Sequence, residues 1–208
     1  MMELSDEYKK LVREVLECKK CRLWKSRKNA VPGEGSLNTK IMFIGEAPGR
    51  MEDLEGRPFV GAAGKLLTEL LSSIGLRRSE VYITNLIKCR PPQNRDPLPD
   101  EVEACSPYLD RQIELLMPKL IVTLGRHSTK YILSKCGIRV TSISRVRGRV
   151  FSIRVNDVSI KVIPTYHPAA ALYNPKMRNI LEEDFKKVVK REVDSLSSTK
   201  KVSIENFF

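Results

Sequence analysis

The feature that most constrains the fold is an alternation of short apolar runs with longer segments of helical periodicity. The apolar runs lie at 40–45, 81–88 and 119–125, and a hairpin near 156–157 leads into a fourth strand that ends at His167. Helical spacing of apolar residues is found at 5–17, 62–75, 98–118, 126–137 and 175–196. Because strands joined by crossover helices pair in parallel, the pattern predicts an α/β protein with a parallel sheet flanked by helices.

Polar residues stand at or near the end of each predicted strand. GEAPG follows the first, Asn85 lies within the second, GRHS follows the third and the fourth ends in YHP. Ligands of open parallel sheets bind beyond the carboxyl ends of the strands, so one edge of the sheet is the expected site. Two nucleotide-binding motifs are excluded: Phe59 stands where a phosphate loop needs glycine, and GEAPG lacks the glycine spacing of a dinucleotide fingerprint.

Length and charge narrow the class further. The 208 residues suffice for one domain, which we place at 1–196, with a polar, flexible tail at 197–208. The net charge of +12 indicates a polyanionic partner, most simply nucleic acid, although a solvated basic surface is the alternative. No apolar run approaches the roughly 20 residues of a membrane span, and the charged start is not a secretory signal. We therefore expect an intracellular protein.

The cysteines indicate a metal centre. Cys18 and Cys21 form a C-x2-C pair, and Cys89 and Cys105 are available as further ligands. Disulfides are not expected inside a cell, although hyperthermophiles are an exception. Four thiolates suit either zinc or an iron–sulfur cluster, and the spacing does not choose between them. The fifth cysteine, Cys136, is interpreted as a core thiol near the end of a helix.

Several linked motifs resemble a known family. They are CKKC from Cys18, GEAPGRMEDLEGRPFVGAAGKLL, ITNLIKCRPPQNRDP with Cys105 downstream, and HPAAAL ending at Leu172. In this order they resemble the iron–sulfur uracil-DNA glycosylases often called family 4. The resemblance implies a three-layer α/β/α fold around a short central parallel sheet. It also implies that Cys18, Cys21, Cys89 and Cys105 hold a [4Fe–4S] cluster of structural role.

The resemblance also implies a pocket for a flipped uracil. Asn85 would accept a hydrogen bond from uracil N3–H and donate one to O4, a pattern that cytosine reverses. Phe59 would stack on the base, and Glu52 would fill the space beside C5 and exclude the thymine methyl. The alternatives are a structural Asn85, a core Phe59 and a solvated Glu52.

The catalytic residues implied by the resemblance are Glu46 and His167. His167 would donate to uracil O2 as the glycosidic bond breaks and so stabilise the developing anion. Ala47 stands where the better-known branch of the superfamily has the Asp that positions water, so Glu46 is the nearest carboxylate. Whether it orients the water or stabilises the cationic sugar is left open. Backbone N–H groups from Gly45 to Ala47 would also contact the base.

DNA contacts are expected around this pocket. Lys88, Arg90 and Arg95 in KCRPPQNR would meet phosphates. Leu172 would wedge into the gap left by the flipped base, or else be an ordinary leucine at a helix start. For His127, a structural or phosphate-contacting role is expected.

The expected activity is that of a monofunctional uracil-DNA glycosylase in base excision repair, acting as a monomer on single- or double-stranded DNA. It would leave an abasic site, without a lyase step. One alternative is a glycosylase that also takes hypoxanthine or other deaminated bases. Another is an inert DNA-binding module with a cluster or zinc.

The end of the tail suggests a second partner. Ile204, Phe207 and Phe208 have the spacing of a peptide that binds a sliding clamp, although Lys201 replaces the usual Gln. The alternative is that these aromatics fold back onto the domain.

Overall fold

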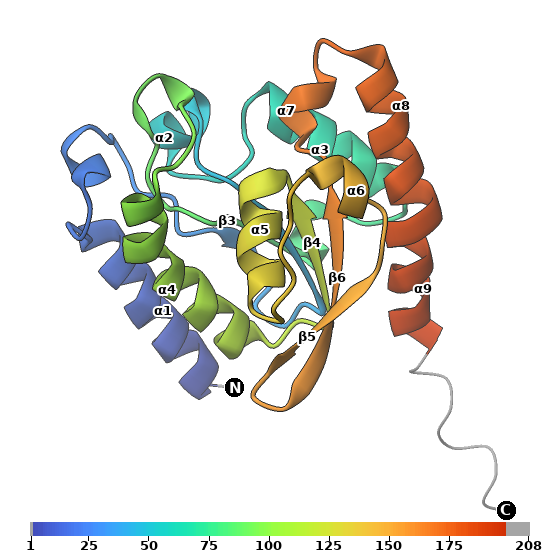
Figure 1. Ribbon diagram of the computed structural model, residues 1–208. Coiled ribbons are helices and arrows are strands. Elements are labelled where there is room, and N and C mark those ends of the chain that lie inside the picture. The colour runs from blue at the N-terminus through green and yellow to red at the C-terminus, as the bar shows by residue number, and fades with distance from the viewer. Residues whose placement is uncertain (1, 199–208) are drawn as a thin grey trace, which may run out of the picture.

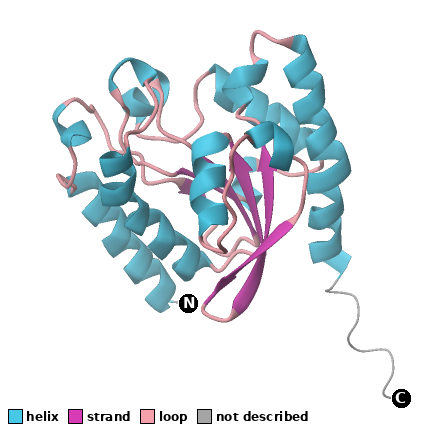
Figure 2. Cartoon of the chain, viewed as in Figure 1, coloured by secondary structure: helices cyan, strands magenta, loops and turns pink. Residues whose placement is uncertain are grey.

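The computed structural model describes residues 2–198 and has a six-stranded sheet at its centre, with strand order β1-β3-β2-β4-β6-β5 (Figures 1 and 2). The strands are β1 Glu34–Gly35, β2 Ile41–Gly45, β3 Tyr82–Asn85, β4 Leu120–Leu124, β5 Phe151–Val155 and β6 Val158–Thr165. The four central strands pair in parallel, as predicted. The two edge strands, β1 and β5, pair antiparallel with their neighbours, so the whole sheet is mixed.

Helices connect the strands and cover both faces of the sheet (Figure 1). The helices before β4 are α1 Met2–Glu17, α2 Arg50–Glu55, α3 Ala62–Ser73 and α4 Pro99–Leu116, with short helical turns η1 Arg22–Lys25, η2 Arg78–Glu80 and η3 Pro92–Asn94. Those that follow are α5 Arg126–Ser134, α6 Ile143–Val146, α7 Pro168–Ala171, α8 Pro175–Asp184, the π-helical turn η4 Phe185–Val189 and α9 Lys190–Ser198. The expected helix at 175–196 is thus three contiguous segments.

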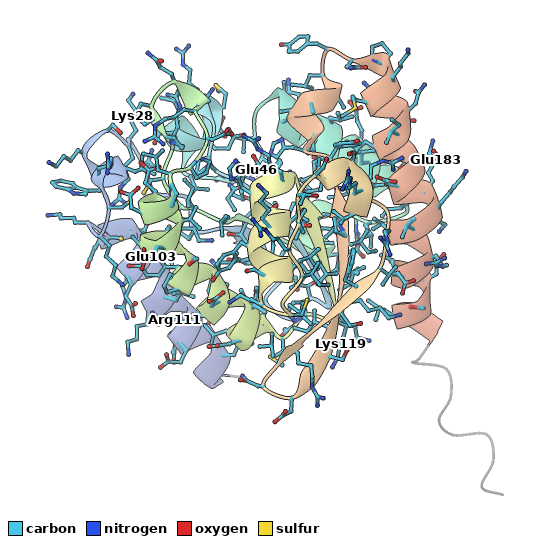
Figure 3. All side chains as sticks on the ribbon, in the orientation of Figure 1. Lys28, Glu46, Glu103, Arg111, Lys119 and Glu183 are labelled. Atoms are coloured by element: carbon cyan, nitrogen blue, oxygen red, sulfur yellow. The ribbon has the colours of Figure 1, made fainter. Side chains whose placement is uncertain are left out.

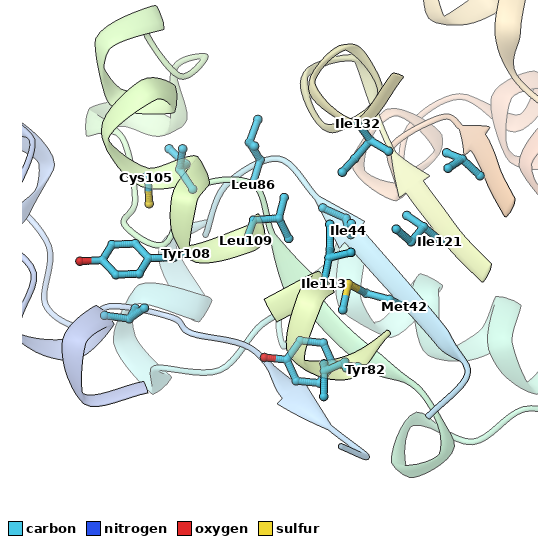
Figure 4. Packing of buried hydrophobic residues seen from close by; sticks show 14 of the residues in the cluster. Met42, Ile44, Tyr82, Leu86, Cys105, Tyr108, Leu109, Ile113, Ile121 and Ile132 are labelled. Atoms are coloured by element: carbon cyan, nitrogen blue, oxygen red, sulfur yellow. The ribbon is translucent and has the colours of Figure 1, made fainter. Parts of the chain in front are cut away.

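Two hydrophobic clusters define the three layers. Side chains of β2 alternate between them: Met42 and Ile44 belong to the first cluster, and Ile41 and Phe43 to the second. Such alternation follows from the two-residue period of a strand and requires apolar residues on both faces. The first cluster includes α1, α4 and α5, and the second includes α3, α8 and η4. Figure 4 shows the first cluster around Met42, with Leu109 and Ile113 of α4 beside the sheet.

Within residues 2–198, no helix combines the length and the apolar character that a membrane crossing requires. Of the tail expected at 197–208, the structure describes the first two residues as the end of α9. Ile204, Phe207 and Phe208 lie outside the described residues, so the clamp peptide stays a prediction.

Candidate active site

A pocket of about 330 Å³ opens at the carboxyl ends of the parallel strands. Seven of the residues that the sequence singled out line it together: Glu46, Ala47, Glu52, Phe59, Asn85, Arg95 and His167. Figure 3 places Glu46 at this edge, beside α5. Gly45 lies beneath the pocket, where an added Cβ would stand 2.3 Å from Asn85 Oδ1 and 2.6 Å from Phe59 Cζ. A side chain at Gly45 would therefore displace two pocket residues.

Asn85 is the last residue of β3 and pairs in register with Gly45 of β2. The residue is 1% exposed, yet its Oδ1 has no hydrogen-bond partner. An unsatisfied buried acceptor costs about 1–3 kcal/mol, which a ligand N–H would recover. The Asn85 side chain can therefore accept a hydrogen bond from a ligand inside the pocket.

Phe59 and His167 form a stacked pair on the wall of the pocket. Their ring centroids are 5.6 Å apart and their planes are inclined by 25°. His167 precedes α7, where its Nδ1 accepts a hydrogen bond from the Ala169 backbone N–H at 3.1 Å. In a neutral imidazole the other nitrogen then carries the proton, so Nε2 is a donor. Burial lowers the pKa of His167, although Glu46 and Glu52 act in the opposite direction.

Glu46 follows β2 and is held by the start of α5. Its Oε1 accepts a hydrogen bond from the His127 backbone N–H at 2.9 Å. The N-terminus of a helix carries partial positive charge, so this position favours a carboxylate. The His127 ring lies beside this carboxylate, because a ring nitrogen of His127 and carboxylate oxygens of Glu46 and Asp96 lie within 4.8 Å of one another. Its Nε2 is 3.3 Å from Asp96 Oδ1, and Arg126 also pairs with Asp96. The sequence reasoning missed Asp96, which brings the loop before α4 to the pocket.

Glu52 has a backbone-binding role that the sequence did not predict. Its Oε1 accepts from the N–H groups of Val60 and Gly61, both at 2.9 Å, and its Oε2 accepts from Gly49 at 3.1 Å. The carboxylate therefore joins the start of α2 to the loop that carries Phe59. A signal was present, because Glu at the third position of a helix is typical of a capping box. The exclusion of thymine by Glu52 stays a prediction.

The four predicted cysteines line one small cavity. Cys18 and Cys21 come from the segment after α1, Cys89 from the loop after β3, and Cys105 from α4. Among residues 2–198, no three of the sulfur atoms lie within 4.8 Å of one another. Burial raises the pKa of Cys105 to about 12, so a bare thiolate is disfavoured there unless a cation offsets its charge.

Hydrogen-bond donors surround these sulfurs. Arg27 Nη1 donates to Cys89 Sγ at 3.1 Å, and the Lys88 backbone N–H donates to Cys105 Sγ at 3.2 Å. Cys136 lies away from them, after α5, and is exposed, so its interpretation as a core thiol is wrong.

One of the expected phosphate contacts is wrong. Lys88 is 1% exposed, and its Nζ donates to Thr84 Oγ1, Asn85 O and Gln112 Oε1, each at 2.7 Å. Burial lowers its pKa to about 7. Arg95 lines the pocket and forms a two-point ion pair with the buried Glu101, so its contact with DNA stays a prediction. Arg90 donates to Asn94 Oδ1 at 2.7 Å and is partly exposed, so its contact with DNA stays a prediction.

Leu172, the residue expected to wedge into the DNA, is not freely exposed. Leu172 is partly buried and packs against the second hydrophobic cluster. The next residue, Tyr173, is 93% exposed in the turn between α7 and α8. Because α7 begins directly after the pocket residue His167, this turn lies on the pocket side of the molecule.

Comparison with known proteins identifies the class to which this fold and pocket belong. A sequence model described as the uracil DNA glycosylase superfamily matches residues 32–191, so the chain belongs to that superfamily. A type-4 uracil-DNA glycosylase of Sulfurisphaera tokodaii is 64% identical over 88% of this chain and 84% of its own length. Type-4 enzymes of Saccharolobus solfataricus and Archaeoglobus fulgidus are 59% and 56% identical, over 93% and 90% of this chain and 88% and 92% of theirs. The resemblance to the type-4 group is confirmed.

Proposed function

We propose that this chain excises uracil from DNA by hydrolysing the N-glycosidic bond, which leaves an abasic site. The observation that carries the proposal is the buried, unpartnered Asn85 Oδ1 in a pocket that also holds Phe59 and His167. Uracil N3–H supplies the missing donor, and the Asn85 amide N–H groups face O4. Cytosine presents the reverse pattern at both atoms, so it leaves polar groups unpaired.

Bond cleavage follows from the donors and the carboxylate around the pocket. The electron pair of the glycosidic bond leaves with uracil N1, and a water oxygen bonds to the sugar C1′. The water gives up one proton as this bond forms, and the uracil anion takes up one, so that the products are the sugar hydroxyl and free uracil. His167 Nε2–H donates to uracil O2 as negative charge develops there. Glu46, held by the His127 N–H, lies where it can orient the water or stabilise the positive charge on the sugar.

The four thiols fit a [4Fe–4S] cluster better than a single zinc ion. Zinc–sulfur bonds of about 2.3 Å in a tetrahedron place the sulfurs about 3.8 Å apart. Among the described residues, no three of the sulfurs of Cys18, Cys21, Cys89 and Cys105 lie within 4.8 Å of one another, which supports a group larger than one zinc ion. A bound cluster would supply cross-linking, since hydrolysis transfers no electrons. The cysteines would thereby fix the loop after Asn85 against α1 and α4.

The partners of this reaction define the setting. A repair enzyme works on intracellular DNA, in single- or double-stranded form, and we propose that this chain acts as a monomer. Arg90 would contact phosphates, and Tyr173 is better exposed than Leu172 to meet the bases around a flipped nucleotide.

The domain would end near residue 196, with Ile204, Phe207 and Phe208 of the tail binding a sliding clamp. Calorimetry with the clamp and a chain ending at Ser198 tests the tail.

One assay separates the candidate activities. The purified chain is incubated with oligonucleotides that carry a single uracil, hypoxanthine or thymine, and strand cleavage is read before and after alkali. We expect cleavage at uracil that depends on alkali, as a monofunctional glycosylase requires. Comparable release of hypoxanthine would support the broader glycosylase, and no release of any base would support an inert DNA-binding module.

A further inference from the structure

The turn that carries Phe59 has an unusual backbone. Phe59 has φ of 53°, in the left-handed region that bulky residues avoid, and its side chain is nonetheless nearly buried in the wall of the pocket. Such a conformation persists only where the surroundings impose it. Helix α3 packs directly against it, because a Cβ on Gly64 would lie 1.8 Å from Phe59 O. The position of the aromatic ring is therefore set by contacts to its backbone.

Two charged side chains hold the peptide groups of this turn from opposite sides. Glu52 accepts from the two amide groups that follow Phe59, as described above. Arg78 donates to the two carbonyl groups on the other side: Nη2 lies 2.9 Å from Pro58 O, and Nη1 lies 3.1 Å from Phe59 O. Side chains from separate segments thus fix the carbonyls on both sides of the Phe59 α-carbon and the two amides that follow it.

Arg78 is itself fixed. Its Nη2 lies 2.6 Å from Glu34 Oε1 in β1, and its side chain is 22% exposed. Glu34 also accepts from Arg57 Nε at 2.8 Å, which ties down the start of the turn. A guanidinium is planar and presents several donors at fixed angles, so it can bind two carbonyls and a carboxylate at once. A lysine at residue 78 would offer one point of charge and could not reproduce this geometry.

We propose that Arg78 is a positioning residue for base recognition, which sets the Phe59 ring against which the flipped uracil stacks. It does so from η2, outside the pocket lining. The inference rests on the proposed excision of uracil, and it adds a residue whose effect passes through Phe59. Loss of Arg78 would free the turn to relax from its left-handed backbone, and the ring would lose its orientation toward the base.

The test compares Arg78→Ala and Arg78→Lys with Arg77→Ala. Arg77 is the neighbouring arginine, but its side chain is 78% exposed and pairs with Glu80. The readout is inhibition of excision by free uracil, with affinity for abasic DNA and melting temperature measured alongside. We expect both Arg78 variants to bind uracil about 3- to 30-fold more weakly, while Arg77→Ala changes by less than about twofold. Affinity for abasic DNA should be retained in all three.

A double-mutant cycle with Phe59→Ala then distinguishes positioning from a general loss of structure. If Arg78 acts through the ring, Arg78→Ala adds little to the loss of uracil affinity in a chain that already lacks the ring. Additive losses would overturn the inference, as would wild-type uracil affinity in both Arg78 variants. If Arg78→Ala does not fold, Arg78→Lys, which retains the charge toward Glu34, serves in the same cycle. Absence of excision by the wild-type chain would instead refute the proposed function.

Discussion

The ring of Phe59 lies against the ring of His167, with centroids 5.6 Å apart. The two residues come from different parts of the chain, a loop between α2 and α3 and the end of the segment after β6. Phe59 is proposed to stack on the flipped uracil, and His167 is proposed to donate a hydrogen bond to uracil O2 as the base leaves. Their contact therefore links base binding to bond cleavage. Small displacements of either ring should therefore affect both binding and bond cleavage.

Replacement of His167 tests the proposed donor. Loss of one hydrogen-bond donor to a developing anion costs about 100- to 1000-fold in rate, and we expect His167→Ala to slow single-turnover excision by that order. Binding of uracil-containing DNA should persist. His127→Ala is a comparison within the site, because the His127 ring lies beside the Glu46 and Asp96 carboxylates. A loss below about threefold in His167→Ala would remove His167 from catalysis.

The pH dependence of stability follows from the same residue. Burial holds the pKa of folded His167 below its usual 6.5, so the unfolded chain binds the proton more readily. The contribution of His167 to folding is therefore fully present above the unfolded pKa and is lost as pH falls below it through the folded pKa. Melting temperatures of the wild type and His167→Asn between about pH 7 and about pH 5 should converge as pH falls. Parallel curves would contradict this assignment.

Asn85→Asp tests whether the Asn85 amide recognises uracil. The unpartnered Asn85 Oδ1 predicts that an amide at this position recognises uracil through N3–H and O4. A carboxyl cannot donate to O4 unless protonated, so uracil excision should fall about 5- to 150-fold. Tolerance of cytosine should rise, because a carboxyl can accept from its N4–H group. Excision from matched uracil and cytosine oligonucleotides measures both changes, and unchanged uracil excision by Asn85→Ala would place Asn85 outside recognition.

Replacements of Tyr173 and Leu172 should have different effects, the first on excision from duplex DNA and the second on the stability of the fold. Tyr173 is 93% exposed, so Tyr173→Ala should reduce excision from duplex DNA by about 5- to 100-fold, while single-stranded DNA is cut as before. Tyr173→Phe keeps the ring and should retain activity. Leu172 packs against the core, so Leu172→Ala should lower the melting temperature. Equal losses on single-stranded and duplex DNA in Tyr173→Ala would rule out a role in opening the duplex.

Cysteine replacements test the metal centre without relying on activity. The aerobically purified protein should be yellow-brown, with absorbance near ~400 nm and several iron atoms per chain. Cys89→Ser should lose colour and iron, whereas Cys136→Ser, at an exposed thiol, should keep both. Arg27→Ala should release iron faster, because Arg27 donates to Cys89 Sγ. A colourless protein with about one zinc per chain would refute the cluster.

The sequence by itself determined the parallel pairing of the central strands and most of the pocket. Apolar runs of strand length between amphipathic helices leave few alternatives to parallel pairing, and this brings Glu46, Asn85 and His167 to one edge. The roles of these residues came from the motifs. The hairpin expected near 156–157 is the antiparallel β5–β6 pair. The other antiparallel edge strand, β1, was not predicted, because it has two residues and leaves almost no pattern.

Only the tertiary structure decided which charged residues face solvent. Lys88 looked like a phosphate contact beside Arg90, yet its ammonium group is enclosed by Thr84, Gln112 and the Asn85 carbonyl. Glu52 and Arg78 likewise appear as surface charges in the sequence, and both bind the backbone around Phe59. Such hydrogen bonds form only when tertiary packing brings the turn around Phe59 close to these side chains. The residue types of Glu52 and Arg78 do not predict that packing. Local patterning therefore fixed the layers, whereas long-range packing decided the contacts that hold the pocket.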